Sequence, residues 1–212
     1  MTKQLKNLIF DFGGILINLD YEQTYNELRS LFNLPQGPFS AYYQNILDEY
    51  EMGYFDEASF IHRLQRSVEH IVSERHIVDA WNAMLLDIPI ERLHFVKELR
   101  KSYNVYLLSN TNHTHLQYVR REVLASMGID QFEEEHFIKA YYSHEIKYRK
   151  PNHDIYQYVI KDSGINPGES LFIDDNLDNV RGAREVGLLA VRHDPNDEII
   201  SCLPKYIQEL ST

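Results

Sequence analysis

The first apolar segment of the chain is short and ends at an acidic residue. Residues 8–10 read Leu-Ile-Phe, and Asp11 follows them directly, ahead of Phe12 and a Gly-Gly pair at 13–14. A run of this length is typical of a buried strand, and two consecutive glycines favour the end of a strand. The pattern therefore predicts that a strand delivers the Asp11 carboxylate into a turn.

The region that follows carries a helical pattern. From residue 20 to about residue 86, apolar side chains recur at a spacing of three and four residues. Asp56 and Ser73 each precede such a periodic segment, where a short polar side chain can cap the first turn of a helix. The pattern predicts several helices and no strand in this region.

After Pro89, helical and strand patterns alternate. The expected strands are 105–109, 137–142, 170–174 and 188–192. The expected helices are 91–101, 116–127, 154–163 and 176–186, and glycines at 128, 164 and 187 would close the last three. The tail is also helical, and Pro204 is expected to interrupt it.

This order of elements predicts an α/β fold. Strands that alternate with helices form βαβ units, which build a doubly wound, mostly parallel, Rossmann-like sheet. Because a purely helical region separates the first strand from the others, that region is interpreted as an inserted helical domain. We therefore predict a core domain made of residues 1–17 and 88–212, and an inserted domain made of residues 18–87.

The composition fits a globular protein and argues against general nucleic-acid binding. Of the 212 residues, 43% are hydrophobic and 25% are charged, and the formal net charge is −11. A nucleic-acid binder would need a basic face. A locally positive or metal-loaded site can still bind a small anionic molecule within an acidic protein. No run approaches the ~18 apolar residues of a membrane span.

The single cysteine, Cys202, cannot form an intramolecular disulfide. The N-terminal segment has lysines but lacks the long apolar stretch of a signal peptide. We therefore expect a cytoplasmic protein without a nucleic-acid or membrane partner. The sequence pattern gives no prediction of an oligomeric state.

Polar and charged residues follow several predicted strands at the point where each strand ends. They are Asp11, Ser109, Asn110, Asp174 and Asp175, with Lys150 just ahead of the helix at 154–163. In doubly wound sheets, ligands bind at the carboxyl ends of the strands. We therefore expect these side chains to form one site.

The chemistry of such a site points to phosphoryl transfer. Three carboxylates at one sheet edge would repel and shift each other's pKa values. A hard divalent cation relieves that repulsion, and oxygen ligands favour Mg²⁺. A lysine beside a hydroxyl and an amide suits a phosphoryl group. A carboxylate in line with the phosphorus can itself become phosphorylated.

The chain resembles the haloacid dehalogenase (HAD) superfamily in four motifs that occur in the family's order. They are FDFGG, LLSNTN, YRKP and FIDDN, and the resemblance spans residues 8–180. The inserted helical domain would be the family's mobile cap over the active site. Response-regulator receivers also combine aspartates, a hydroxyl and a lysine, but in them the acid pair comes first in the chain. Here Asp174 and Asp175 come last.

The resemblance implies a catalytic role for several residues. Asp11 would be the nucleophile that forms an aspartyl-phosphate. Lys150 would neutralise the charge of the nucleophile and of the phosphate. Ser109 and Asn110 would hold the phosphoryl oxygens.

The resemblance also implies a Mg²⁺ site. Asp11 and Asp175 would be direct ligands, and Asp174 would bind directly or through water. The backbone carbonyl of Gly13 would complete the ligand set, a contact that any residue can supply.

Gly13 departs from the pattern of most phosphatases of the family. The residue two positions after the nucleophile is usually a second aspartate, which protonates the leaving oxygen and then activates water. Such general acid–base help is typically worth ~10²–10⁴-fold in rate. Because glycine has no side chain, another group would have to supply this help.

Three hypotheses follow. The first is a Mg²⁺-dependent phosphatase of a small phosphorylated metabolite, with sugar phosphates favoured, because the anomeric oxygen of a sugar 1-phosphate needs less protonation. The second is a catalytically weak protein that binds phosphate and Mg²⁺ as a sensor or partner-binding module. The third is a 2-haloacid dehalogenase, which needs no second acid, although the acid pair in IDDN argues against it.

A bacterial subgroup that includes glucose-1-phosphate phosphatases pairs a similar first motif with SNTNxxH and RKPxxxxY. The matching residues are Asn112, His115 and Tyr156. His115 is therefore a candidate stand-in acid or substrate contact, and Asn112 a candidate substrate contact. A lone histidine can equally be structural.

The segment EMGYFDEASF at 51–60 is the candidate substrate-selecting part of the cap. Family members often carry a glycine-containing turn here that reaches into the active site. Glu51, Gly53 and Tyr54 are candidate substrate contacts, and an ordinary turn between helices is the alternative. Arg149, beside Lys150, is either a further positive charge near the site or a solvated side chain.

Overall fold

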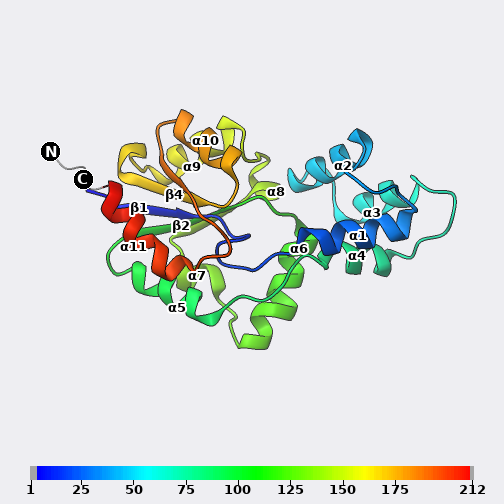
Figure 1. The fold of residues 1–212 in the computed structure, drawn as a ribbon, viewed down its shortest axis with the longest axis horizontal. Coiled ribbons are helices and arrows are strands. Elements are labelled where there is room, and N and C mark those ends of the chain that lie inside the picture. Colours follow the sequence, from blue (N-terminus) through cyan, green and yellow to red (C-terminus); the bar gives the residue numbers. More distant parts are fainter. Residues whose placement is uncertain (1–3, 211–212) are drawn as a thin grey trace.

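The computed structural model describes residues 4–210, and its centre is a parallel sheet (Figure 1). The strands are β1 (Asn7–Phe10), β2 (Asn104–Ser109), β3 (Lys139–Tyr142), β4 (Ser170–Asp174) and β5 (Leu189–Arg192). Their order across the sheet is β3-β2-β1-β4-β5, and every neighbouring pair is parallel. The carboxyl ends of β2, β1 and β4 therefore lie side by side at one edge.

Helices cover both faces of the sheet (Figure 1). One face carries α5 (Ile90–Leu99), α7 (Phe132–His136), α11 (Ile199–Leu210) and the helical segment after β2. The other carries α9 (His153–Ser163) and α10 (Leu177–Glu185). Along β1, Leu8 and Phe10 pack into the core of the first face and Ile9 into that of the second. The predicted doubly wound α/β fold is confirmed.

The helical segment after β2 begins earlier and winds less regularly than predicted. α6 (His113–Tyr118) starts after Asn112, whose side chain accepts a hydrogen bond from the His115 amide at 3.0 Å. A π-helical turn (Val119–Leu124) and a 3₁₀ turn (Ala125–Met127) follow. The wider π turn lets Val119 and Leu124, five residues apart, pack into the same core. A search for α-helical spacing does not detect such a turn.

α11 continues through Pro204, so the predicted interruption was wrong. Ile199 and Leu203 are fully buried in the core beside the sheet, and Cys202 between them is half-buried. Pro204 has no backbone N–H and cannot donate the usual helical hydrogen bond. The packing of Ile199 and Leu203 stabilises this turn of the helix in its place. Neither α11 nor any other helix within residues 4–210 has the length and apolar character needed to cross a bilayer.

The inserted residues form a helical unit that stands beside the sheet (Figure 1). Its helices are α1 (Tyr21–Phe32), α2 (Ala41–Glu51), α3 (Glu57–Gln65) and α4 (Glu74–Asn82). Their buried side chains form a hydrophobic core of their own. Asp56 and Ser73 cap α3 and α4 as predicted, by accepting hydrogen bonds from the amides of Ser59 and His76.

Two chain segments connect the helical unit to the sheet, and they pair with each other. The Asn18 amide donates to the Asp87 carbonyl at 3.0 Å, and the Asp20 amide to the Met84 carbonyl at 2.9 Å. The boundaries expected at residues 17/18 and 87/88 fall in these paired segments. The division into a core and a cap domain remains a prediction.

The turn after α2 lies against the backbone of the short helix that follows β3, and this contact leads to a prediction about stability. Gly53 has φ +63°, and a Cβ there would lie 2.1 Å from the carbonyl oxygen of His144 in the short helix α8 (Ser143–Ile146). Gly53→Ala should therefore lower the free energy of unfolding by at least about 3 kcal/mol, through backbone strain and overlap together.

Gly128→Ala is the matched control, because Gly128 has φ +71° but nothing within 4 Å of its would-be Cβ. This variant should lose only about 1 kcal/mol, from backbone strain alone. Urea unfolding of the wild type and both variants measures the two losses. Equal losses would contradict the close contact at Gly53.

Candidate active site

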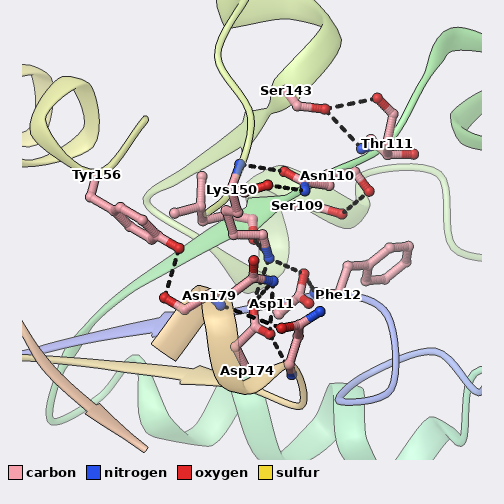
Figure 2. Close-up of polar contacts among 12 residues, drawn as sticks. Asp11, Phe12, Ser109, Asn110, Thr111, Ser143, Lys150, Tyr156, Asp174 and Asn179 are labelled. Atoms are coloured by element: carbon pink, nitrogen blue, oxygen red, sulfur yellow. Dashed lines mark hydrogen bonds and ion pairs between the residues drawn. The ribbon is translucent and has the colours of Figure 1, made fainter. Parts of the chain in front are cut away.

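The residues that follow or end β1, β2 and β4 converge at the carboxyl edge of the sheet (Figure 2). Asp11 comes directly after β1, Ser109 ends β2 and Asp174 ends β4, and all three are buried. Lys150 reaches this edge from the loop before α9. Its Nζ lies 2.7 Å from Asp11 Oδ1 and 2.7 Å from Asp174 Oδ2. It also donates to the Leu108 carbonyl at 3.0 Å.

The site carries more negative than positive charge. Burial raises the pKa of the Asp11 carboxyl well above its ordinary value, and Asp174 and Asp175 add to this while Lys150 opposes it. Burial also raises the pKa of Asp175. For Lys150, burial lowers the pKa, but the charges of Asp11 and Asp174 outweigh it and leave the pKa raised. A cation bound here would relieve the remaining repulsion.

Three carboxylates could hold that cation. Asp11, Asp174 and Asp175 each offer one oxygen, and these oxygens lie within 4.8 Å of one another. Gly14 makes room for them, since its φ is +69° and a Cβ there would lie 2.7 Å from Asp175 Oδ2. Because every donor is an oxygen, the set fits a hard cation such as Mg²⁺.

Asp174 accepts four hydrogen bonds from the protein. The Asn179 side chain donates to both of its oxygens at 3.0 Å, and Lys150 and a backbone amide of the next turn donate at 2.7 and 2.8 Å. The Tyr156 hydroxyl in turn donates to the Asn179 carbonyl at 2.8 Å (Figure 2). The geometry favours Asp175 as the direct ligand and Asp174 as the residue that orients Lys150. Sequence reasoning missed Asn179. Its position one helical turn after Asp175 could have indicated that its side chain lies near the acid pair.

Ser109 and Asn110 both line the site but differ in their contacts. Asn110 Nδ2 donates to the Lys150 carbonyl, and its Oδ1 accepts from the Lys150 amide, each at 2.9 Å. Its side chain therefore fixes the loop that carries Lys150. The Ser109 hydroxyl donates only a long hydrogen bond of 3.4 Å, to the Asn110 carbonyl. Ser109 is thus the better placed of the two to bind a phosphoryl oxygen, and both contacts remain predictions.

His115 and Asn112 belong to the junction between the helical unit and the sheet. His115 Nε2 lies 2.9 Å from the Trp81 carbonyl and Nδ1 lies 3.2 Å from Asn112 Nδ2. The imidazole stacks on the Trp81 ring, with 4.6 Å between centroids. Burial lowers the pKa of His115 to about 4, so the ring is neutral near pH 7 and its N–H points to Trp81. These contacts argue against His115 as a proton donor. Asn112 is fully buried and lies outside the cavity lining.

Among the three candidates of segment 51–60, Glu51 alone lines the cavity. Burial raises the pKa of Glu51, and its carboxylate accepts a hydrogen bond from Arg149 Nε at 2.7 Å. Arg149 also lies 3.2 Å from Asp48, so it is an ion-paired residue and not a solvated one. Gly53 packs against α8, and Tyr54 is 59% exposed. Neither contacts the cavity, which argues against a substrate role for them.

A cavity of about 730 Å³ lies between the helical unit and the carboxyl edge. Side chains from α1 and α2 form the wall opposite Asp11, and Glu51 is the one among them that sequence reasoning named as a candidate. They are Tyr21, Tyr25, Gln44, Leu47, Asp48 and Glu51. Their spacing in the sequence indicates that they act together, because the residues from α1 share one face of that helix and the residues from α2 share one face of theirs. The sequence does not say whether such a face meets a core or a cavity.

The chain belongs to the haloacid dehalogenase-like hydrolase family, whose family model matches residues 5–187. It is similar to D-ribitol-5-phosphate phosphatase from Bacteroides thetaiotaomicron, with 29% identity over 185 residues that cover 86% of this chain and 89% of that protein. The resemblance found from the four motifs is confirmed.

Two solved structures of a HAD family enzyme from Bacteroides thetaiotaomicron share the fold. The magnesium complex has a TM-score of 0.84 and 33% identity, and covers 95% of this chain and 99% of its own. The complex with magnesium and inorganic phosphate has a TM-score of 0.79 and 33% identity, with coverage of 92% and 97%. A predicted HAD-like hydrolase from Porphyromonas gingivalis has a TM-score of 0.83 and 28% identity, with coverage of 97% and 98%.

Asp11→Asn is expected to stabilise the metal-free protein. Because the pKa of Asp11 is raised, the folded state favours the neutral carboxyl, and stability is lost as the pH rises through the folded-state pKa. An amide cannot ionise. The variant should therefore have a larger free energy of unfolding than the wild type at about pH 8 with a chelator, and the difference should vanish near pH 4.

Asp162→Asn is a control with the opposite sign. A hydrogen bond from Lys139 lowers the pKa of the exposed Asp162 carboxyl, so its ionised form supports the folded state at about pH 8 and this support is lost as the pH falls. Urea unfolding at both pH values measures the two effects. A destabilised Asp11→Asn at pH 8 would contradict the excess of negative charge at the site.

Proposed function

We propose that this hydrolase is a Mg²⁺-dependent phosphatase of a small phosphorylated metabolite, with sugar and sugar-alcohol phosphates favoured. The observation that carries the proposal is the meeting of Asp11, Asp175 and Lys150 at the carboxyl edge of the sheet, beside a cavity of about 730 Å³. A nucleophile, a metal site and a paired cation thus lie together. The similarity to a ribitol-5-phosphate phosphatase and to an enzyme crystallised with magnesium and phosphate supports this class of reaction.

In the proposed mechanism, Asp11 attacks the phosphorus in line with the leaving oxygen. The new O–P bond gives an aspartyl-phosphate, and the bond from phosphorus to the leaving oxygen breaks. Water then hydrolyses the aspartyl-phosphate to free Asp11 and inorganic phosphate. Lys150, 2.7 Å from Asp11 Oδ1, lowers the pKa of Asp11 against the effect of burial and so favours the ionised nucleophile. The Ser109 hydroxyl is proposed to bind a phosphoryl oxygen.

Mg²⁺ is proposed to bind Asp11, Asp175 and the backbone carbonyl of Gly13, with Asp174 reached through water. The oxygen-only donor set and the excess of negative charge fit this ion. When bound, Mg²⁺ supplies positive charge that stabilises the phosphoryl oxygens. The protein holds the two carboxylates in place through Gly14, which leaves room for Asp175.

The far wall of the cavity suits a neutral, hydroxyl-rich group. Gln44, Asp48 and Glu51 from α2 and Arg149 from the sheet side line it. These side chains offer donors and acceptors for hydroxyl groups. Arg149 is paired with both Asp48 and Glu51, so the wall has an excess of negative charge that disfavours a second anionic group on the substrate. This supports a sugar or sugar-alcohol monophosphate over a bisphosphate or nucleotide.

A catalytically weak phosphate-binding sensor is the second candidate, and Gly13 is the observation that favours it. Without an acid at this position, the aspartyl-phosphate could form and break slowly, so that binding and not turnover would be the function. A dehalogenase has less support, because the Asp174–Asp175 pair serves no purpose in a reaction that needs no metal.

The first test is phosphate release from a panel of sugar and sugar-alcohol phosphates. The purified protein should release phosphate with Mg²⁺ and not with EDTA. Asp11→Asn should lower kcat by at least about 10³-fold, because the nucleophile is lost, whereas Asp162→Asn, an exposed carboxylate far from the cavity lining, should retain full activity. No release from any substrate by a folded protein that binds Mg²⁺ would favour the sensor.

A second test addresses the wall of the cavity. Asp48→Asn should raise KM for ribitol 5-phosphate about 10-fold, because a charged acceptor for substrate hydroxyls is weakened. KM for p-nitrophenyl phosphate, which has no such hydroxyls, should change little. Asp79→Asn, the same charge change on the outer surface of α4 with 64% of the side chain exposed, is the control. Equal changes for both substrates would contradict a contact with the sugar hydroxyls.

A further inference from the structure

Leu19 and Tyr21 lie beside the place where a side chain of residue 13 would project. A Cβ on Gly13 would lie 2.6 Å from Leu19 Cδ1 and 3.9 Å from the Tyr21 hydroxyl oxygen. Both residues flank Asp20, which caps α1, so the start of α1 brings them against the loop after β1. The Leu19 side chain would have to move to admit a larger residue here. Outside residues 12–14, the Tyr21 hydroxyl is the polar group nearest to this position.

The cations and the histidine that line the cavity each have a protein partner. Lys150 is paired with Asp11 and Asp174, Arg149 is paired with Glu51, and Arg192 Nε donates to the Asp175 carbonyl at 2.9 Å. His115 is turned toward Trp81. The Tyr21 hydroxyl lines the cavity as well, and within residues 4–210 it has no hydrogen-bond partner. It can therefore donate a hydrogen bond to a bound molecule.

The surrounding charges distinguish Tyr21 from its neighbour Tyr25. Burial raises the pKa of the Tyr21 hydroxyl, followed by the charges of Asp11 and Asp175, although 47% of the residue is accessible because it borders the cavity. For Tyr25, burial is again first, but the carboxylates that follow are Glu51 and Glu22. The Tyr21 hydroxyl thus feels the charges of the site at the sheet edge, whereas the Tyr25 hydroxyl feels those of Glu51 and Glu22.

We propose that the Tyr21 hydroxyl donates a hydrogen bond to the leaving oxygen of the substrate, where an acid at residue 13 would otherwise act. This inference rests on the proposed phosphatase function. When the bond from phosphorus to the leaving oxygen breaks, its electron pair stays on that oxygen, and the Tyr21 O–H stabilises the charge. Water gives the oxygen its proton, and the hydroxide formed hydrolyses the aspartyl-phosphate. Tyr21 keeps its own proton throughout.

Tyr21→Phe tests this role because it removes only the hydroxyl oxygen and keeps the ring that stacks on Tyr25. For an alkyl phosphate that carries no hydroxyl groups, such as ethyl phosphate, kcat/KM should fall about 10²-fold, the usual loss when a donor to a developing negative charge is removed. For p-nitrophenyl phosphate it should change little, since nitrophenolate leaves without such help. A merely structural role would lower both rates alike.

Tyr25→Phe is the matched control and should show no dependence on the leaving group. Urea unfolding verifies that both variants are folded. Equal effects of Tyr21→Phe on the two substrates, or no effect on either, would overturn the role of Tyr21 while leaving the phosphatase in place. Absence of phosphate release by the wild type would overturn the proposed function and, with it, this role.

Discussion

Lys150 carries a positive charge into a buried edge of the sheet, where only 1% of its side chain is accessible. An unpaired charge at such a place costs several kcal/mol, so the ammonium group needs at least one carboxylate partner, and it has contacts of 2.7 Å to Asp11 and 2.7 Å to Asp174. They require β1 and β4 to lie side by side and the loop before α9 to pass over them. Asn110 holds the backbone of that loop from β2.

Arg149, the residue before Lys150, also pairs with two carboxylates, on the other side of the cavity. Arg149 pairs with Asp48 and Glu51 of α2, whereas Lys150 pairs with acids of the sheet edge. Two consecutive cations therefore tie the loop to the helical unit and to the sheet at once. On each side two or more carboxylates face one cation, so both walls keep an excess of negative charge. That excess is unfavourable for the empty protein and favourable for binding a cation and a neutral, hydroxyl-rich group.

The polar residues at strand ends were predictable because parallel strands end at the same edge of a sheet. Asp11, Ser109 and Asp174 could be predicted as site residues from their position at the end of an apolar run. The fold could be predicted from the alternation of helical and strand patterns along the chain. The other predictions show where this reasoning stops. His115 looked like an acid from its motif, but burial against Trp81 leaves it neutral and bound. Gly53 looked like a substrate contact, but its backbone meets α8.

The order of the elements, the α/β class and the acidic, lysine-containing site could be predicted from the chain alone, because these depend on local periodicity and on which residue follows each strand. Which face of α1 and α2 borders the cavity depends on tertiary packing, and so does the position of Tyr21 beside Gly13. A helical pattern shows that one face is apolar or aromatic, but not what lies opposite it. That depends on how the paired segments near Asn18 and Asp87 orient the helical unit against the sheet.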